Sequence, residues 1–464
     1  MSLLHIVRVN ICYAIMPKKD LRTVVIEKLV PGGLGLGRLK EGIVVMVRYV
    51  LPGEKVLVNE EDRKKDYISA TLRDILSPSP DRIVPPCPYF GRCGGCDLQH
   101  AGPEAQMRLK KAILADNLQR NAGNLFSGSP LTIEEPLEAP EQFNYRQRLR
   151  LQVDREGRYG FFRPGSHILE PISQCLLARD ELNNVLLQLR TSDTFPELAK
   201  HCNAFELLFN PAENDTVMLL HFLRRPRPGD CQLSAGLAHD TNGLASILMQ
   251  VEGYGLYDPL AQTFLTAPPI LSHTMAIQKI KTELTLSWEA GGFCQVNLEQ
   301  NSNLVNLVLE MVVNGRHSRT LDLYCGYGNF SLPVAITGAE VLGIDAQNAA
   351  IRSARRNAEQ NGIHNCRFEK NQVTGAVTAL CTAGKTFETI ILDPPRQGAF
   401  ETVALLPKLG PDRIIYISCN PATLARDLAA LMEAGYQLSR LVPVDMFPQT
   451  HHLESVALLK RSSL

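Results

Sequence analysis

The sequence lacks three features that would place a protein in a class at once. No stretch approaches the run of about 20 apolar residues that spans a bilayer. The formal net charge is +0 over 464 residues, so any nucleic-acid partner would have to meet local basic surface rather than a global positive field. No internal repeat or low-complexity tract occurs. A hydrophobic content of 45% supports ordinary buried cores, and the length allows about two to four domains.

The amino-terminal stretch also lacks the marks of a secretory signal. Residues 1–15 are apolar, but they carry no basic n-region and no small-residue cleavage site. A second methionine, Met16, follows, so residues 1–15 are expected to be a start-site extension or a short added strand. The chain is therefore expected to be cytoplasmic, and its 12 cysteines are not expected to form a disulfide framework.

Residues 17–78 read as all-β. Short β-branched runs cover residues 23–30, 42–50, 54–61 and 67–76, and "PGGLGLG" at 31–37 is interpreted as a turn-rich break between the first two. Strands this short predict a small barrel of the OB type. A linker, "SPSPDRIVPP", follows the barrel.

Three further regions follow the barrel. Residues 79–125 carry a cysteine cluster and then a helical pattern, "EAQMRLKKAILADNLQRN". Residues 126–290 mix α and β patterns, and "YRQRLRLQVD" alternates like a strand. Residues 291–464 alternate strands with helices, which predicts an α/β fold with a doubly wound, mostly parallel, Rossmann-like sheet covered by helices on both faces.

The predicted strand ends of the last region carry polar residues. The segment "LDLYCGYGNFSLPVA" reads as a strand that enters a loop with Gly326 and Gly328, and these glycines would let the backbone approach a ligand closely. Asp345 ends the next predicted strand, at a position where an acid often binds ribose hydroxyls. The loop lacks the full G-x-G-x-x-G pattern, which favours S-adenosylmethionine over NAD. Asp393 ends a third strand, and the two prolines after it would stiffen the rim of a pocket.

A cysteine, Cys419, ends a fourth strand and directly precedes Asn-Pro. Carbon 5 of a pyrimidine is a poor nucleophile, but a thiolate that adds at carbon 6 converts the ring to an enolate whose carbon 5 can attack a methyl group. A base must then remove the carbon 5 proton, and Glu454 is a candidate for that role. A strand-end cysteine taken alone is more often a small buried apolar residue.

Five motifs carry a family resemblance: "FCQVN", "DLYCGYGNF", "DPPRQG", "SCNPATLARD" and "THHLES", in this order. The chain resembles the S-adenosylmethionine-dependent RNA 5-methyluridine methyltransferases over essentially its whole length. The resemblance implies that Cys419 is the nucleophile and Glu454 the base. It also implies a cofactor and base pocket lined by Gln295, Tyr324, Asn329, Asp345 and Asp393. Asp345 stands where some relatives have glutamate, and Asn371 is a further candidate for an adenine contact.

A second cluster has the spacing C-x5-C-x2-C, with Cys87, Cys93 and Cys96. Zinc would require a fourth ligand, for which His100 is available, whereas an iron–sulfur cluster could take its fourth cysteine from far along the chain, such as Cys175. The family resemblance favours the second choice. It implies the branch that has an amino-terminal TRAM barrel and binds a 4Fe-4S cluster through these four cysteines.

The predicted partner is RNA. Residues 143–163 interleave arginines, which bind phosphates, with aromatic rings, which stack on splayed bases; the alternative is an ordinary half-exposed strand. Relatives with the barrel and cysteine cluster tend to modify 23S rRNA, and those without them transfer RNA, so 23S rRNA is expected and tRNA is the alternative. Base-nitrogen methylation is disfavoured because Arg396 replaces an aromatic residue and Cys419 is present. The intact Cys419, Asp393 and Glu454 also disfavour a vestigial RNA-binding assembly factor. No obligate protein partner is indicated, and the chain is expected to be a monomer.

Overall fold

The computed structural model describes residues 21–122, 132–312 and 318–462. Residues 1–15, predicted to be an extension or added strand, lie outside the described residues. The chain divides into two compact units. The first runs up to residue 106 and also includes residues 163–166 and 449–451, and the second holds the remainder. Among the described helices, none combines the length and the apolar character needed to cross a membrane.

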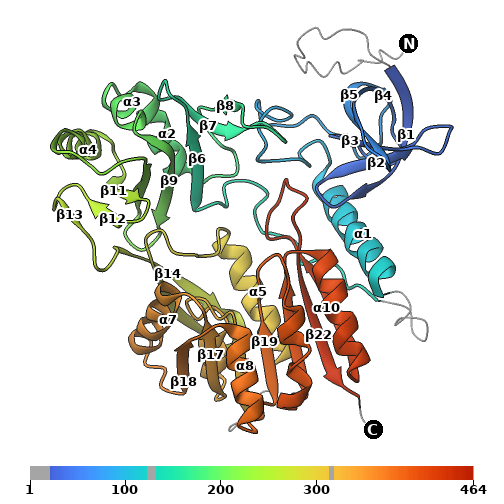
Figure 1. Cartoon of the computed structure of the whole chain (residues 1–464), viewed down its shortest axis with the longest axis vertical. Helices are drawn as coiled ribbons and strands as arrows, with labels where there is room; N and C mark the ends of the chain where they lie inside the picture. Colours follow the sequence, from blue (N-terminus) through green and yellow to red (C-terminus); the bar gives the residue numbers. More distant parts are fainter. Residues whose placement is uncertain (1–20, 123–131, 313–317, 463–464) are drawn as a thin grey trace. The chain divides into compact units, whose positions relative to one another are not determined.

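The first unit contains a closed five-stranded barrel with the order β1-β2-β3-β5-β4 (Figure 1). Its strands are β1 (Leu21–Val30), β2 (Leu34–Arg38), β3 (Val44–Arg48), β4 (Lys55–Arg63) and β5 (Tyr67–Ser77). Alternate residues, among them Val24, Ile26, Val56 and Val58, fill its interior, as the period-2 geometry of strands requires. The predicted barrel is confirmed.

The prediction of a turn-rich break at 31–37 is wrong in part, because residues 34–38 form strand β2. Gly35 and Gly37 serve close packing rather than a turn. A Cβ at Gly35 would lie 2.2 Å from Val50 Cγ2, and a Cβ at Gly37 would lie 2.4 Å from both Val24 Cγ1 and the Val25 carbonyl oxygen. Only glycine lets β2 approach its neighbours closely enough to close so small a barrel.

The second unit opens with most of helix α1 (Pro103–Ala122), as predicted, followed by an eight-stranded sheet with the order β13-β12-β11-β10-β9-β6-β7-β8. Its strands are β6 (Arg148–Val153), β7 (Tyr159–Phe162), β8 (Leu169–Pro171), β9 (Cys202–Asn210), β10 (Asp215–Phe222), β11 (Leu244–Val251), β12 (Gly255–Asp258) and β13 (Thr263–Phe264). Helices α2 (Asp180–Thr191), α3 (Thr194–Ala199) and α4 (Pro228–Asp240) pack with it, and a hairpin of β14 (Ile270–Ile277) and β15 (Thr282–Glu289) follows.

The carboxyl-terminal part forms a seven-stranded sheet with the order β18-β17-β16-β19-β20-β22-β21. Its strands are β16 (Arg319–Leu323), β17 (Glu340–Asp345), β18 (Cys366–Lys370), β19 (Thr389–Leu392), β20 (Arg413–Ser418), β21 (Tyr436–Val444) and β22 (Glu454–Arg461). Its helices are α5 (Leu298–Met311), α6 (Ser331–Ile336), α7 (Asn348–Gln360), α8 (Val373–Thr382), α9 (Phe400–Val403) and α10 (Pro421–Glu433). The five strands from β16 to β20 are parallel.

Both faces of this sheet are buried. Along β19 and β20, Ile390 and Ile414 belong to one hydrophobic cluster, and Ile391 and Ile415 belong to another. The first cluster includes residues of α1, α8 and α10, and the second includes residues of α5, α6 and α7. The helices lie around the strands in Figure 1. Continuous apolar runs such as "RIIYIS" reflect this two-sided burial.

The predicted alternation of strands and helices ends at α10, after which two strands, β21 and β22, follow one another. β22 lies antiparallel between β20 and β21. The predicted doubly wound sheet is therefore confirmed, with an antiparallel pair at one side. This reversal of direction decides where the start of β22 lies.

Candidate active site

The predicted site residues gather at one edge of the seven-stranded sheet. Because β16, β17, β18, β19 and β20 are parallel neighbours, their carboxyl ends meet at the same edge. The residues that end or directly follow these strands are Tyr324, Asp345, Asn371, Asp393 and Cys419. The fold thus brings together five positions that are as much as 95 residues apart in the sequence, from 324 to 419.

Glu454 joins this edge through the antiparallel strand. In the register of β20 with β22, Ser418 pairs with Ser455. The first residue of β22, Glu454, therefore lies beside Cys419, which directly follows β20. The backbone hydrogen bonds between β20 and β22 thus hold Cys419, just after the end of one strand, beside Glu454, at the start of the other. Paired strands are a rigid support for a site.

Glu454 is buried, with 7% of its surface exposed, and its Oε2 has no hydrogen-bond partner among the described residues. Burial raises the pKa of Glu454 well above its ordinary range, the Asp393 charge adds to the effect, and Arg396 opposes it. An unpaired buried carboxylate is costly, so the protonated form is favoured in the absence of a ligand. A carboxyl group with a raised pKa is, once ionised, a stronger base than an ordinary carboxylate.

Cys419 and Asp393 share this electrostatic environment. Burial raises the pKa of the Cys419 thiol to about 11, with further contributions from Glu454 and Asp393, while Arg396 lowers it. Burial also raises the pKa of Asp393 to about 7. A negative charge on Glu454 or Asp393 therefore disfavours ionisation of the Cys419 thiol, whereas the positive charge of Arg396 favours it. The N-terminus of α10, which begins two residues later, contributes favourably to a thiolate.

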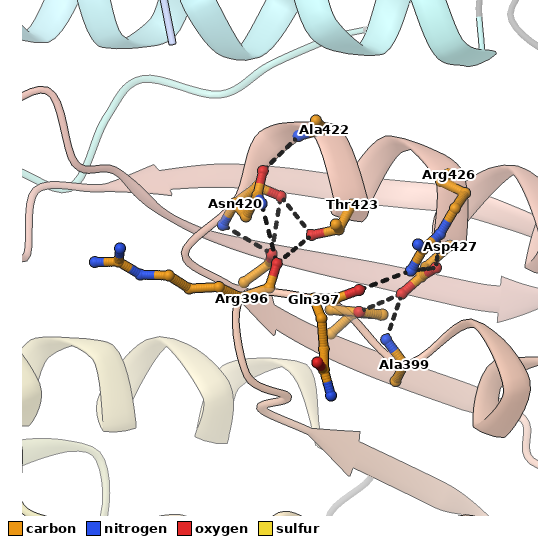
Figure 2. Close-up of polar contacts among 10 residues, drawn as sticks. Arg396, Gln397, Ala399, Asn420, Ala422, Thr423, Arg426 and Asp427 are labelled. Atoms are coloured by element: carbon orange, nitrogen blue, oxygen red, sulfur yellow. Dashed lines mark hydrogen bonds and ion pairs between the residues drawn. The ribbon is translucent and has the colours of Figure 1, made fainter. Parts of the chain in front are cut away.

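The loop of residues 393–399 is fastened to the start of α10 by a set of polar contacts that we name the α10 clamp (Figure 2). The Arg396 carbonyl accepts hydrogen bonds from Asn420 Nδ2 at 3.0 Å and from Thr423 Oγ1 at 3.3 Å. Arg426 Nη2 donates to the Gln397 carbonyl at 3.1 Å. The Arg396 side chain itself extends away from these contacts in Figure 2.

A buried carboxylate completes the α10 clamp. Asp427 Oδ2 accepts the Ala399 N–H at 2.8 Å and the Tyr416 hydroxyl at 2.6 Å. Gly398 passes directly beside it with φ 74, and a Cβ there would lie 2.6 Å from Arg426 Nη2 and 2.7 Å from Asp427 Oδ2. The segment "NPATLARD" thus holds the loop that carries Asp393 against the strand end that carries Cys419.

Asn420 also caps α10. Its side chain accepts the Ala422 N–H at 3.0 Å, and Pro421 occupies the first helical turn, where its missing N–H costs nothing. The Ser418 hydroxyl contacts the Asn420 backbone at 3.2 Å. Cys419 lies between these two anchored residues, so its position is fixed on both sides.

The predicted cofactor loop has the backbone that its glycines indicate. Tyr324, Gly326 and Gly328 have φ of 62, 56 and 91, and nothing lies within 4 Å of where a Cβ of Gly326 would be. Asp345 accepts the Gly326 N–H at 3.1 Å and the Gln347 N–H at 2.8 Å. Its carboxylate organises the loop and retains acceptor capacity for a ribose hydroxyl.

The other predicted pocket residues differ in their surroundings. Asn329 is buried and exchanges hydrogen bonds with the Asn301 amide on α5, at 2.8 and 2.9 Å, so its side chain fastens the loop to that helix. Gln295 is 8% exposed, and its carbonyl accepts from Gln147 Nε2 at 2.7 Å. Asn371 donates its backbone N–H to the Asp345 carbonyl at 3.0 Å, and its side chain is exposed.

Sequence reasoning missed one acid near the site. Asp322 on β16 is fully buried and accepts a hydrogen bond from the Ser331 hydroxyl at 2.5 Å. Burial raises its pKa to about 7, with Asp393 and Asp345 among the further causes. An acid inside the apolar run "TLDL" was the available signal. The α10 clamp was also missed, and its signal was the polar spacing that follows Cys419.

The second cysteine cluster lies in the first unit. Cys87, Cys93 and Cys96 are all half-buried, and the Gly95 N–H donates to Cys93 Sγ at 3.4 Å, a contact that suits a metal-bound thiolate. Cys175 lies in the second unit, where Asn183 bonds its backbone. Across residues 21–122, 132–312 and 318–462, no group of three or more His, Cys, Asp or Glu side chains is arranged to hold a metal ion. His100 is 1% exposed, and burial lowers its pKa to about 3.

The stretch of residues 143–163 is partly a core strand. Tyr145 and Tyr159 are buried, and their hydroxyls donate to the carbonyls of Pro448 at 3.1 Å and Leu186 at 2.6 Å. Arg148 pairs with buried Glu206 at 2.6 Å. These three side chains therefore serve the domain itself, in agreement with the alternative interpretation. Arg150 lies 3.7 Å from the same carboxylate, but 55% of its side chain is exposed, so it stays a candidate for phosphate contact.

Comparison with known proteins extends these observations. Residues 271–462 match the protein family described as tRNA (Uracil-5-)-methyltransferase. The 23S rRNA (uracil(1939)-C(5))-methyltransferase RlmD of Aeromonas hydrophila is 35% identical over 433 residues, which cover 92% of this chain and 93% of the relative. The enzyme of the same name from Pectobacterium atrosepticum is 35% identical over 451 residues, which cover 96% and 94%. The crystal structure of Pyrococcus abyssi tRNA (uracil-54, C5)-methyltransferase in complex with S-adenosyl-L-homocysteine matches with a TM-score of 0.69 at 25% identity, and covers 94% of this chain and 100% of that one.

The chain has a seven-stranded sheet with acids and a thiol at one edge, and it matches a solved methyltransferase over most of its length. These two observations define the class as a Rossmann-like methyltransferase. Identity of 35% over nearly the whole length then identifies the family. The chain belongs to the RNA (uracil-5-)-methyltransferases, and the resemblance carried by its motifs is confirmed.

Proposed function

We propose that the protein transfers a methyl group from S-adenosylmethionine to carbon 5 of a uridine in 23S rRNA. The observation that carries the proposal is the β20–β22 register, which sets Glu454 beside Cys419. The rRNA is favoured over tRNA because the relatives that are 35% identical are 23S rRNA enzymes, whereas the tRNA enzyme is 25% identical.

In this proposal the cofactor supplies an electrophilic methyl group, and the chain supplies the remaining chemistry. Cys419, after its thiol loses a proton, would add as the thiolate to carbon 6 of the uracil, and carbon 5 of the resulting enolate would attack the methyl group, whose bond to the cofactor sulfur breaks and leaves a thioether. Glu454 would have to be ionised at this stage, with its own proton already lost to solvent; it would then take the carbon 5 proton, carbon 6 would expel the thiolate, and the aromatic ring would be restored. The raised pKa of Glu454 makes it a stronger base than an ordinary carboxylate.

The cofactor residues are proposed on the geometry of the sheet edge. Asp345 would hold ribose hydroxyls, and the open side of Gly326 leaves room for a ligand beside the loop. Gln295, Tyr324, Asn329 and Asp393 would line the cofactor and base pocket, and Asn371 would lie near the adenine. The α10 clamp would keep Asp393 and Cys419 at a fixed separation during the reaction.

We further propose that Cys87, Cys93, Cys96 and Cys175 hold a 4Fe-4S cluster. The support is the C-x5-C-x2-C spacing and the N–H donated to Cys93 Sγ at 3.4 Å. The chemistry above has no redox step, so the role of such a cluster would be structural or in organising RNA contacts. His100 is a poor alternative ligand because its ring is buried against Tyr49 and Phe90.

The experiment for the proposed function compares nucleosides from 23S rRNA and tRNA of a deletion strain by mass spectrometry, with the wild type and a complemented strain as controls. Loss of one 5-methyluridine from 23S rRNA, restored by the wild-type gene and not by a Cys419→Ala gene, is the expected result. Loss from tRNA alone would support the alternative substrate. Unchanged 5-methyluridine in both RNAs would contradict the proposal.

A further inference from the structure

The loop between β21 and β22 is buried at its start, although it forms neither helix nor strand. It spans residues 445–453, and residues 445–448 lie in the second unit together with both strands. Asp445, Met446 and Pro448 are all buried. Loops normally run over the surface, because the N–H and carbonyl groups of a buried backbone need partners. This loop therefore requires hydrogen-bond donors from the elements around it.

Side chains from three separate parts of the second unit donate to three successive carbonyls of the loop. The donors and the residues whose carbonyls accept are Asn297 Nδ2 and Met446 at 3.3 Å, Lys110 Nζ and Phe447 at 3.1 Å, and Tyr145 Oη and Pro448 at 3.1 Å. We name these three contacts the loop cradle. Lys110 lies on α1, Asn297 caps α5, and Tyr145 precedes β6, so the cradle fixes the loop from several directions.

A buried ion pair strengthens the loop cradle. The side chains of Lys110 and Asp445 are 0% and 1% exposed, and Lys110 Nζ lies 2.6 Å from Asp445 Oδ1. The Asp445 N–H donates to the Leu137 carbonyl at 3.0 Å. A buried ammonium group is costly unless it is paired and hydrogen-bonded, so Lys110 strongly favours the arrangement in which it holds both the Asp445 carboxylate and the Phe447 carbonyl.

The loop cradle lies at the end of the hairpin where Glu454 stands. Val444, the last residue of β21, pairs with Glu454, and Asp445 directly follows Val444. The register of β20 with β22 ends at the pair of Ser418 and Ser455, so Glu454 is one residue beyond that pairing. Strand ends open more readily than strand interiors. The backbone of Glu454 therefore depends on β21 and on the loop that follows β21.

We propose that the loop cradle positions Glu454 for removal of the carbon 5 proton, with Lys110 and Tyr145 as positioning residues. The inference rests on the proposed function for the step that Glu454 carries out. In that step the proton passes from carbon 5 to the Glu454 carboxylate, and the bond between carbon 6 and the Cys419 sulfur breaks. Proton transfer requires close contact between the two atoms. Because the α10 clamp holds Cys419 separately, a weaker cradle slows the resolution of the covalent adduct and leaves its formation unchanged.

The test uses the full chain, S-adenosylmethionine and an RNA fragment that contains the target uridine, in single-turnover reactions. Tyr145→Phe removes the hydroxyl that donates to the loop and keeps the ring. The methylated adduct is expected to resolve about three- to tenfold more slowly, the effect of one neutral hydrogen bond, so a covalent species that survives denaturation should accumulate. With an RNA that carries 5-fluorouridine at the target, where carbon 5 has no proton to lose, the rate of adduct formation should equal that of the wild type.

The matched control is Tyr436→Phe, at the opposite end of β21. Tyr436 is 4% exposed, and its hydroxyl donates to the Pro411 carbonyl at 2.9 Å, so this change also removes a buried bond from a tyrosine to a proline carbonyl. Both variants should lower the melting temperature, but only Tyr145→Phe should slow resolution of the adduct. Lys110→Met removes two contacts of the loop and should slow resolution further. Equal slowing in Tyr145→Phe and Tyr436→Phe would refute a positioning role.

Amide hydrogen exchange at residues 452–456 supplies a measurement that needs no turnover. Exchange should be faster in Tyr145→Phe than in the wild type and in Tyr436→Phe, because the start of β22 opens more often. If the wild type forms 5-methyluridine but Tyr145→Phe resolves its adduct at the wild-type rate, the positioning role is refuted and the proposed function stands. If the wild type forms no 5-methyluridine, the proposed function fails; faster exchange in Tyr145→Phe alone would still support the hold on Glu454, and unchanged exchange would refute it.

Discussion

The α10 clamp gives a sharp prediction, because one buried carboxylate bonds both the loop that follows Asp393 and the scaffold of the site. Asp427 is 0% exposed. Its Oδ2 receives the Ala399 N–H and the Tyr416 hydroxyl, and its Oδ1 receives Arg426 Nε at 2.8 Å. In Asp427→Asn, the amide NH2 group must face either these two donors or Arg426. At least one donor group is then left without its acceptor.

The magnitude follows from the hydrogen bonds that the substitution removes. Hydrogen bonds to a charged acceptor contribute about 1.5–3 kcal/mol each, and Arg426 is partly exposed, so its pairing is discounted. The loop of residues 393–399 is therefore expected to lose about 2 kcal/mol of its preference for its position against α10, which corresponds to roughly a 30-fold lower rate of adduct formation. Binding of S-adenosylmethionine should change less, because Asp345 and its loop are not part of the clamp.

The assay is the rate of covalent complex formation with an RNA that carries 5-fluorouridine at the target, measured beside the dissociation constant of the cofactor. Tyr416→Phe is the matched control, since it removes one donor and leaves the carboxylate in place; it should reduce the rate by a smaller factor. A wild-type rate in Asp427→Asn would show that the loop needs no clamp. Equal losses of rate and cofactor affinity would indicate general unfolding instead.

Three further predictions concern the site and the cysteines. Cys419→Ala should bind RNA and cofactor but form no adduct, whereas Glu454→Gln should transfer the methyl group and then accumulate a covalent RNA–protein species that survives denaturation; absence of both adduct and product in Glu454→Gln would place the glutamate before methyl transfer. Asp393, whose pKa is raised to about 7, binds its proton more tightly in the folded state, so its contribution destabilises the fold as pH rises from about 4 to 7. Asp393→Asn should therefore raise the melting temperature relative to the wild type at pH 8 and have little effect at pH 4, and an equal shift at both pH values would contradict this. Anaerobically purified protein should contain about four iron atoms and lose them in Cys175→Ala while it still binds S-adenosylmethionine; one equivalent of zinc without iron would refute the cluster.

The sequence by itself determined which chemistry the protein carries and on which kind of scaffold. Apolar runs that end in Asp345, Asp393 and Cys419 sufficed to predict a parallel sheet with its polar residues at one edge, because parallel strands must share their carboxyl ends. The barrel was also predictable from its short β-branched runs, but Gly35 and Gly37 were taken for a turn. Their role depends on how closely neighbouring strands approach, which a local pattern does not contain.

Only the tertiary structure decided which of these residues meet and what each side chain bonds. Glu454 lies beside Cys419 because β22 runs antiparallel to β20, and strand direction is set by pairing between distant segments. Asn329 was predicted to line a pocket, which stays a prediction; the structure adds that its amide pairs with Asn301. The arginines of residues 143–163 were interpreted as phosphate ligands or as the charged face of an ordinary strand, and Arg148 among them pairs with Glu206 on the neighbouring strand β9. A polar side chain in a sequence has many possible partners, and packing selects among them through distances that only the folded chain fixes.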